Sequence, residues 1–462
     1  MDAWAWPVLE RLPLAEAVLL AWSHVAEEGY LRELFDQHRG ACYEKQLSFP
    51  VLVQLIGDVL MGQSPSARRR FTDAVAAAEL PASIPAAYGK LRRLPVPLSV
   101  AFLAGCTARL QALWPAASAV TLPPCVRDWS VLVLDGKAIK RVAKRLKPLR
   151  GAPGGVLGGR ALVALTLRQG LALALEADPD GETNDVRLVP SLLPAVRGRT
   201  PGPRLWVADR QFCAPQVLTD LLAEGDHVLV RYHGNVCFTR DPTRPVGTGQ
   251  DADGRTWREE WGWLGGVQNP QRRFVRRITL ERPGQEAIIP VTDLLDAQRF
   301  PATALLELYR QRWGIERMFQ QVTEVFGLEA LIGSTPEATI FQFSFCLVLY
   351  NVIQVVRAYV AGAGKRPAAE VSGEQLFQDV TKQLIAWREL LTPADTVALL
   401  PPRSTAAVCH RLQSVLGGLW RAAWTKAPRQ RRREPTKKRR RQHGSVYRIL
   451  QEHRPAPKKK TS

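Results

Sequence analysis

The chain has 462 residues, a formal net charge of +20 at pH 7 and a sequence pI near 10.1. That length allows a large core and two or three domains, and so positive a balance points to a polyanion, usually nucleic acid. Residues 426–462 hold 15 Lys and Arg against 2 acidic residues, a net charge of +13, so the first 425 residues carry only +7. Any strong positive field on the body must therefore be local.

Several classes of protein are excluded at once. The cysteines have no CxxC pair and no Cys/His spacing for zinc, which predicts reduced thiols rather than a zinc site or a disulfide framework. The N-terminus lacks a basic segment followed by an unbroken apolar run, so no targeting peptide is expected. The most apolar stretch, residues 343–356, is too short to span a bilayer and contains Asn351 and Gln354. We expect a cytoplasmic protein without a membrane partner. The seven cysteines are Cys42, Cys106, Cys125, Cys213, Cys237, Cys346 and Cys409.

Residues 1–120 are expected to form a helical N-terminal domain. Apolar residues recur with helical spacing over 31–35 and 51–60. A basic turn at 64–70, containing three consecutive arginines, follows, and then a further helical stretch over 74–80. This arrangement suits a DNA-binding helical module, but a solvated basic turn explains it equally well.

Residues 121–233 are expected to form the first part of an α/β core. A basic segment over 137–150 and a glycine-rich stretch over 151–159 lie within it, and the latter lacks the strand-then-helix setting of a phosphate-binding fingerprint. The order of the other elements predicts a mixed sheet with crossover helices. The predicted elements are a strand at 130–134, a hairpin at 161–167 and 171–177, a helix at 185–196, a strand at 204–208, a helix at 215–223 and a strand at 227–232.

The rest of the chain divides into four parts. From residue 234 the helical signal disappears, and aromatic and aliphatic residues alternate with Arg and Glu as in strands. The basic low-complexity tail is expected to be disordered on its own. The four parts are a β-rich insert over 234–296, a second core part over 297–362 with helices at 301–330 and 336–361, a helical C-terminal region over 363–425 and the basic tail over 426–462.

Two aspartates follow the apolar cores of two predicted strands. Asp135 comes directly after Val-Leu-Val-Leu, and Asp209 after Leu-Trp-Val-Ala. Sites in such sheets form at the carboxyl ends of the strands, where two converging carboxylates repel each other unless a cation lies between them. Carboxylate oxygens suit Mg²⁺ or Mn²⁺. Either aspartate alone would be an ordinary strand-end residue.

The predicted helix over 301–330 carries a polar stripe. Tyr309, Arg312, Glu316 and Thr323 stand at i, i+3, i+7 and i+14, which keeps them near one face of a helix. The bland interpretation is an exposed, salt-bridged face. In a basic chain that also has Asp135 and Asp209, a third metal ligand at Glu316 becomes the better hypothesis.

These residues together resemble the DDE transposases of bacterial insertion sequences. The resemblance rests on Asp135 in Val-Leu-Asp-Gly-Lys, Asp209 in Val-Ala-Asp-Arg-Gln-Phe, and Tyr309-x2-Arg312-x3-Glu316. It is closest to the insertion-sequence-four family, whose signature is Tyr-x2-Arg-x3-Glu-x6-Lys, and it covers about residues 20–360. It implies a ribonuclease H-like mixed sheet flanked by helices and interrupted by the β-rich insert.

The resemblance also implies an activity and its site. Asp135, Asp209 and Glu316 are expected to bind two Mg²⁺ or Mn²⁺ ions, with which water cleaves a phosphodiester at the transposon end and the freed 3′-hydroxyl attacks another strand. Tyr309 and Arg312 would hold DNA phosphates, as the planar fork of arginine does well, and Arg210 is a further DNA contact. The partners implied are the terminal inverted repeats and target DNA, bound by a homodimer in the bacterial nucleoid.

One position departs from the family pattern. The family lysine falls on Thr323, and no lysine occurs between Lys147 and Lys365. Arg317 or another arginine is the expected substitute for holding phosphate. The tryptophans of the insert, Trp257, Trp261 and Trp263, are candidates for stacking on a flipped base, but aromatic residues in strands more often belong to a core.

Two other functions remain open. One is a divalent-metal nuclease on the same core that cleaves without strand transfer, and the other is a non-catalytic, transposase-derived DNA-binding protein. The basic tail would add salt-sensitive affinity for DNA, or would be a solvated tail without a specific role.

Overall fold

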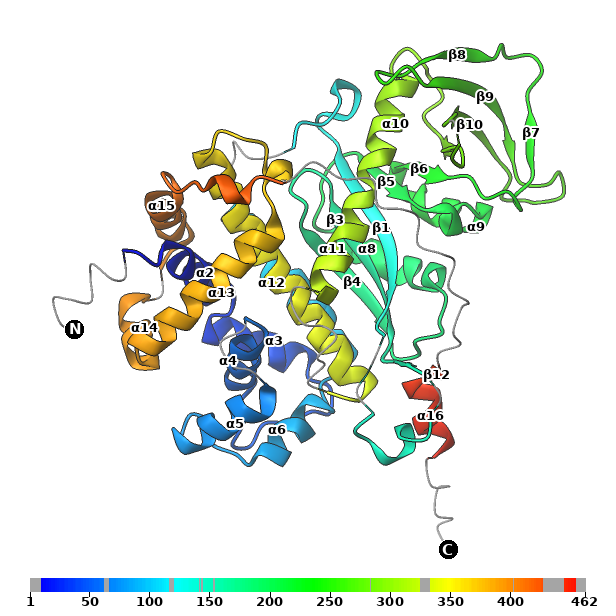
Figure 1. Ribbon diagram of the computed structural model, residues 1–462. Helices are drawn as coiled ribbons and strands as arrows, with labels where there is room; N and C mark the ends of the chain where they lie inside the picture. Colours follow the sequence, from blue (N-terminus) through cyan, green and yellow to red (C-terminus); the bar gives the residue numbers. More distant parts are fainter. Residues whose placement is uncertain are drawn as a thin grey trace, which may run out of the picture.

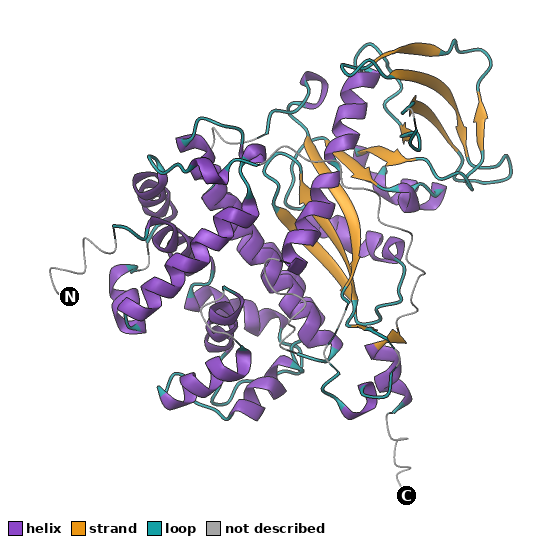
Figure 2. Cartoon of the chain, in the orientation of Figure 1, coloured by secondary structure: helices purple, strands orange, loops and turns teal. Residues whose placement is uncertain are grey.

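In the computed structural model, a long mixed sheet stands beside a large body of helices (Figures 1 and 2). The strands are β1 (Ser130–Ala138), β2 (Val156–Leu157), β3 (Arg160–Thr166), β4 (Ala172–Asp178), β5 (Arg204–Ala208), β6 (His227–Arg231), β7 (Phe238–Arg240), β8 (Gly247–Gln250), β9 (Thr256–Leu264), β10 (Arg273–Leu280), β11 (Pro290–Thr292) and β12 (Gly444–Ser445). The structure describes residues 10–61, 66–115, 120–140, 142, 144–152, 154–282, 284–324, 333–401, 403–426 and 444–453.

The helices fall into an N-terminal group, a group around the sheet and a C-terminal group. The first is α2 (Pro13–Val25), α3 (Glu28–His38), α4 (Phe49–Leu60), α5 (Ala67–Ala76), α6 (Ile84–Leu91) and α7 (Val96–Gln111). The second is α8 (Val189–Arg197), α9 (Pro215–Leu221), α10 (Ala302–Gln311), α11 (Trp313–Glu324) and α12 (Pro336–Ala363). The third is α13 (Gly373–Leu390), α14 (Pro393–Leu399), α15 (Thr405–Leu416) and α16 (Val446–Glu452).

The core of the sheet has the ribonuclease H-like order. The strands run β4-β3-β1-β5-β6, with β3 and β4 antiparallel in a hairpin and with β1, β5 and β6 parallel. Alternate residues of β1 face opposite sides, as the pleat requires: Val131 and Val133 join the core under the helical body, and Leu132 and Leu134 join the core under α8 and α9. The predicted mixed sheet is confirmed, and both of its faces are covered.

The β-rich insert continues the same sheet. Strand β11 pairs antiparallel with β6, and the order goes on through β10 and β9 to β7, with β8 also on β9. Figure 1 shows the insert as a separate lobe beyond the end of α10. The insert is thus fixed to the core by backbone hydrogen bonds between β6 and β11.

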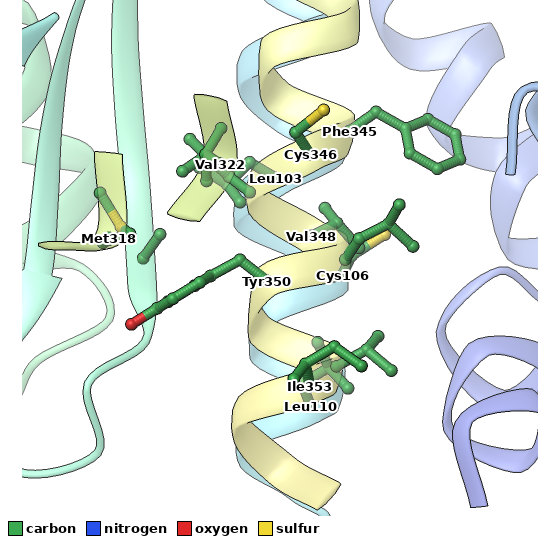
Figure 3. Packing of buried hydrophobic residues seen from close by; sticks show 14 of the residues in the cluster. Leu103, Cys106, Leu110, Met318, Val322, Phe345, Cys346, Val348, Tyr350 and Ile353 are labelled. Atoms are coloured by element: carbon green, nitrogen blue, oxygen red, sulfur yellow. The ribbon is translucent and has the colours of Figure 1, made fainter. Parts of the chain in front are cut away.

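Helix α12 is the centre of the helical body. Its buried side chains contact α7, α2, α13 and α15, and aromatic pairs link it to the N-terminal helices, with ring centroids 5.2 Å apart for Trp22 and Phe345 and 5.5 Å for Phe102 and Phe341. Figure 3 shows α12 against α7, with Tyr350 directed toward α11. The N-terminal and C-terminal helices therefore share one apolar core around α12.

A polar contact sets the depth of α12 against the sheet. The amide of Asn351 donates to Thr107 Oγ1 (2.8 Å) and to the carbonyl of Ala172 (2.9 Å), and its oxygen accepts from the Ala172 N–H (2.9 Å). These hydrogen bonds satisfy a fully buried amide at the meeting of α7, α12 and β4. By length and composition α12 could cross a membrane, and its most apolar window is 100% buried inside the protein.

The structure differs from the prediction in two elements, one expected as a helix and one as a turn. The single helix expected over 301–330 is two helices, α10 and α11, that meet at Arg312, and residues 325–330 lie outside the described part. The basic turn expected at 64–70 is partly helix, because α5 begins at Ala67. Within α5, Arg70 is buried and paired with Asp58 and Glu79, each at 2.7 Å. Arg70 is thus a structural residue and is not available to DNA.

Part of the basic tail is folded, contrary to the expectation of disorder. Gly444 and Ser445 form β12, which runs parallel to β2, and α16 follows it (Figure 1). The Ser445 hydroxyl accepts from the Gly181 N–H (3.2 Å), and Arg448 donates to Asp180 (2.8 Å). Backbone pairing and an ion pair on acidic residues of the core dock this segment, which composition alone does not reveal. Residues 427–443 and 454–462 lie outside the described part.

Candidate active site

The two sequence-predicted aspartates lie on adjacent parallel strands. Leu134 of β1 is in register with Ala208 of β5, so the next residues, Asp135 and Asp209, stand side by side. Neighbouring strands are about 4.8 Å apart, which brings the two carboxylates within reach of one cation. Ala208 is in turn in register with Val230, so Arg231 at the end of β6 stands at the same level. Asp135 lies inside β1, opposite Val163 of β3, rather than after the strand as the sequence predicts.

Both aspartates are partly buried. Burial raises the pKa of Asp135 to about 6, and the nearby Glu316 and Asp185 carboxylates act in the same direction, while the Gly136 N–H and Arg312 oppose them. The Gly136 N–H donates to Asp135 Oδ1 over 2.9 Å. The Oδ1 atom of Asp209 is buried without a hydrogen-bond partner. A buried acceptor of this kind is costly unless something satisfies it.

The meeting of α10 and α11 places the helical residues of the site. Around Arg312 the backbone tightens: the Arg312 N–H donates to the Tyr309 carbonyl and the Ile315 N–H to the Arg312 carbonyl, each over 3.1 Å and three residues. Such 3₁₀ pairing changes the direction of a helix locally. Tyr309 is 2% exposed and Arg312 4% exposed, so the polar stripe, for which a solvated face was the alternative, faces inward at these positions.

The positive charge of Arg312 interacts with all three carboxylates, Asp135, Asp209 and Glu316. Its Nη2 lies 2.9 Å from Glu316 Oε1. Although burial opposes its ionisation, Tyr309, Asp209, Glu316 and Asp135 together raise the pKa of Arg312. Burial raises the pKa of Tyr309 to about 12, with Asp209 also raising it and Arg312 lowering it. The site therefore assembles two strand carboxylates, one helix carboxylate and one buried guanidinium.

The donor set partly fits a divalent cation. Asp135 and Asp209 supply hard oxygens side by side, and the unpartnered Asp209 Oδ1 is an open ligand position. Among the described residues, however, no three His, Cys, Asp or Glu side chains converge tightly enough to form a metal cluster. Glu316 is engaged with Arg312 instead, and its side chain is 52% exposed. The carboxylates of Asp135 and Asp209 are thus already positioned for a cation. Glu316 could become a third ligand only by giving up its ion pair with Arg312.

A fourth carboxylate supports the site and was missed by sequence reasoning. Asp185, 1% exposed, pairs with Arg160 of β3 and accepts from Gln211 (2.9 Å) in the turn that follows Asp209. It packs so closely on Gly136 that a Cβ there would lie 1.9 Å from the Asp185 Cγ. Asp185 thus links the backbone beside Asp135 to the turn beside Asp209. Its position at the start of a predicted helix was the only signal, since an Asp there looks like a helix cap.

The other predicted contacts are less central. Arg210 is exposed at the start of the turn after β5. Arg317 acts electrostatically on Tyr350 and Arg357 of α12, so it lies on the α12 side of α11. Thr323 is half-buried, and its hydroxyl donates to the Phe319 carbonyl (2.7 Å). The DNA-binding roles of Arg210 and Arg317 stay predictions.

The three insert tryptophans differ in exposure. Trp261 is 8% exposed and its indole N–H donates to the Leu295 carbonyl (2.9 Å), so it is a core residue, and Trp257 is half-buried. Trp263 is 40% exposed, with its ring 5.3 Å from that of Phe274 and the Arg272 guanidinium 4.8 Å from its centroid. Among the three, Trp263 is the one that presents a ring to solvent.

The central part of the chain matches a known family. Residues 128–352 match the family model described as the transposase DDE domain. No curated protein matches the chain. Among solved structures, the piggyBac transposase synaptic complex with hairpin DNA is similar at 12% identity and a TM-score of 0.41, over 86% of this chain and 85% of that one. Asp135, Asp209 and Glu316 all lie within the matched residues. The match covers just under half of the chain and supports a DDE transposase domain in this part of it, and with it a DNA-cleaving enzyme.

Proposed function

We propose that this chain is the transposase of a bacterial insertion sequence, of the insertion-sequence-four type, and that it binds the terminal inverted repeats and cleaves and joins DNA strands. One observation carries the proposal: Asp135 and Asp209 directly follow Leu134 and Ala208, the last paired residues of two adjacent parallel strands, and both lie within electrostatic reach of Arg312, which also holds Glu316. The match of residues 128–352 to the transposase DDE domain supports it.

Asp135, Asp209 and Glu316 would hold the divalent ions, Mg²⁺ or Mn²⁺. Two such ions supply an activated water or hydroxyl and stabilise the leaving oxygen of a phosphodiester. Because Leu134 of β1 pairs with Ala208 of β5, two of the proposed ligands would stand side by side before any ion arrives. Burial favours the neutral form of Asp135, so the free site carries less negative charge than three carboxylates would at full ionisation.

Arg312 has two tasks in this scheme. In the free protein its guanidinium offsets the carboxylates and holds Glu316 at 2.9 Å. If Glu316 were to hold an ion in place of its contact with Arg312, the fork of Arg312 would be open to a DNA phosphate, which it could bind through two parallel N–H groups. Tyr309, buried beside Arg312, orients the guanidinium with its ring 5.7 Å away. Arg210 and Arg317 are proposed DNA contacts outside this centre.

The substrate is double-stranded DNA, first the inverted repeats and then the target. A homodimer would hold the two ends together, in the bacterial cytoplasm with the nucleoid. The basic residues of the tail would add affinity that falls steeply with salt. Trp263 is the proposed platform for a flipped base, because base stacking needs an exposed aromatic face.

A strand-transfer assay tests the proposal. Labelled duplexes that carry the inverted repeats flanking the gene are incubated with protein, Mg²⁺ and a target plasmid. We expect cut ends and joined products, both lost in Asp135→Asn and Asp209→Asn. Cut ends without any joined product would replace the transposase with a metal nuclease on the same core. Joined product from Asp135→Asn at the wild-type rate would contradict the site itself.

A further inference from the structure

The strand next to β5 ends in a positive charge beside the carboxylates. Ala208 of β5 is in register with Val230 of β6. Arg231, the last residue of β6, therefore follows at the level of Asp209. Neighbouring strands are about 4.8 Å apart, so Arg231 stands one strand beyond Asp209 and two strands beyond Asp135. The three residues form a row across β1, β5 and β6, at the place where the proposed metal site lies.

The side chain of Arg231 is directed to the same face of the sheet as the two aspartates. The residues that precede Asp135, Asp209 and Arg231 by two positions lie in the core on the side of the helical body, and residues i and i+2 of a strand share a face. These preceding residues are Val133, Val207 and Leu229. Helix α10 packs on β6. Burial raises the pKa of Tyr309 on this helix to about 12, and both Arg312 and Arg231 lower it, so Arg231 lies near the phenol.

Arg231 is paired with an exposed carboxylate. Its Nη2 lies 2.9 Å from Glu286 Oε2, in the connection between β10 and β11. The side chain of Glu286 is 71% exposed, whereas that of Arg231 is 21% exposed. An ion pair with so exposed a partner contributes little to stability and is weakened by salt. A phosphate can therefore take the place of Glu286 without a large cost.

The neighbouring arginines have other partners. Arg282 braces the same connection, donating to the Glu286 carbonyl and to Gln285 Oε1, each over 3.0 Å. Burial and the nearby Arg231 lower the pKa of Arg282, so the two guanidinium groups lie close enough to repel each other, and an anion at Arg231 would relieve that repulsion. Arg312 offsets the carboxylates of the site. Arg231 thus combines a place at the level of the aspartates with a partner that is readily exchanged.

We propose that Arg231 is a DNA-positioning residue that binds the backbone phosphate next to the cleaved one, on the β6 side of the aspartates, in place of Glu286. The planar fork of arginine can hold two oxygens of one phosphate. A DNA strand whose cleaved phosphate lies at Asp135 and Asp209 then runs across β5 toward β6. The inference rests on the proposed function, since it requires DNA at this site. Glu286 occupies the place of the phosphate in the free protein, so its neutralisation should strengthen DNA binding.

The test compares Arg231→Gln, Arg231→Lys and Glu286→Gln. Binding of inverted-repeat duplexes is measured without metal over a range of salt, and end cleavage is measured with Mg²⁺. For Arg231→Gln we expect the slope of log affinity against log salt to fall by about 1 and cleavage at subsaturating DNA to fall roughly tenfold, with most of the loss recovered at saturating DNA. Arg231→Lys keeps the wild-type salt slope. Glu286→Gln should bind DNA about threefold more tightly than wild type. The control is Arg258→Gln, at an insert arginine whose side chain is 52% exposed, which should cleave at the wild-type rate.

A double variant separates phosphate binding from a purely structural ion pair. An arginine that only held the connection between β10 and β11 would give the same defect in Arg231→Gln and in Glu286→Gln. A general gain of positive charge from Glu286→Gln would persist when it is added to Arg231→Gln, whereas we expect the gain to vanish there. Matching defects in the two single variants, a gain that persists without Arg231, or a loss of cleavage that Arg231→Lys shares in full would overturn the proposed role. A chain that binds and cuts with these dependences but never joins ends would contradict the transposase proposal and leave the role of Arg231 intact.

Discussion

The strand half and the helix half of the active site are held in different ways. Asp135 and Asp209 directly follow Leu134 and Ala208, which pair across two parallel strands in the middle of a sheet covered on both faces. Glu316 stands on a helix that begins after a 3₁₀ step, with its side chain half-exposed and paired with Arg312. A sheet positions side chains through hydrogen bonds that a single substitution hardly moves, whereas a helix at such a junction can shift. The strand half is preorganised, and the helix half is adjustable.

The largest expected effect is the loss of strand cleavage when a proposed metal ligand is replaced. Metal binding then distinguishes the strand ligands from the helix ligand. Asp209→Asn and Glu316→Gln should both lower strand cleavage by about 10³-fold or more, because either loses several kcal/mol of transition-state stabilisation. Thermal unfolding distinguishes them. Mn²⁺ should raise the melting temperature of wild type and of Glu316→Gln, since the strand pair is intact, but not of Asp209→Asn. Equal loss of the Mn²⁺ shift in both variants would show that the strand pair is not preset.

Removing the shared guanidinium should destabilise the protein. Arg312→Met leaves Asp135 and Asp209 buried without their compensating charge, at a cost of about 3 kcal/mol. It should also raise the pKa of Asp135 further, because Arg312 lowers it now. Urea unfolding without metal measures the first effect. Arg310→Met is the matched control: Arg310 is exposed and pairs only loosely with the exposed Asp253 (3.5 Å), so its loss should leave stability unchanged.

The burial of Asp135, a proposed metal ligand, predicts that this residue lowers the stability of the metal-free protein at neutral pH. Its pKa is about 6 in the folded protein, above the ordinary value of 3.8, so the folded state holds this proton more tightly than the unfolded state. The stability that Asp135 contributes is therefore full below pH 3.8 and is lost as pH rises through 6. Asp135→Asn, which cannot ionise, should be more stable than wild type by about 2–3 kcal/mol at pH 7.5 without metal. The difference should fade below pH 5; a gain independent of pH would exclude Asp135 as its source.

Sequence reasoning reached the strand half more fully than the helix half. Apolar runs ending at Asp135 and Asp209 located the sheet and its functional edge, because strand patterns and strand ends are local signals. The spacing of Tyr309, Arg312 and Glu316 located the helix, but the step at Arg312 depends on packing against β1 and α12. Asp185 escaped notice, since it belongs to no local pattern that marks a site. The docking of residues 444–453 on β2 was equally hidden, because it joins segments almost 300 residues apart.

Adding a single methyl group at one of two glycines tests the difference between the strand half and the helix half of the site. Gly136 of β1 leaves no room for a methyl group, since its Cβ would lie 1.9 Å from the Asp185 Cγ. Gly136→Ala must therefore displace Asp185 or the strand, and it should cost about 1–2 kcal/mol and lower cleavage. Gly314 of α11 has open space, with Leu165 Cδ2 at 4.0 Å from its Cβ.

In a helix, alanine is favoured over glycine, so Gly314→Ala should raise stability by up to about 1 kcal/mol. If adjustment of α11 is part of the reaction, that stiffer helix should cleave more slowly while binding DNA as tightly as wild type. Urea unfolding and single-turnover cleavage of both variants give the two comparisons side by side. A faster Gly314→Ala enzyme would mean that α11 already stands in its working position, and that both halves of the site are preorganised.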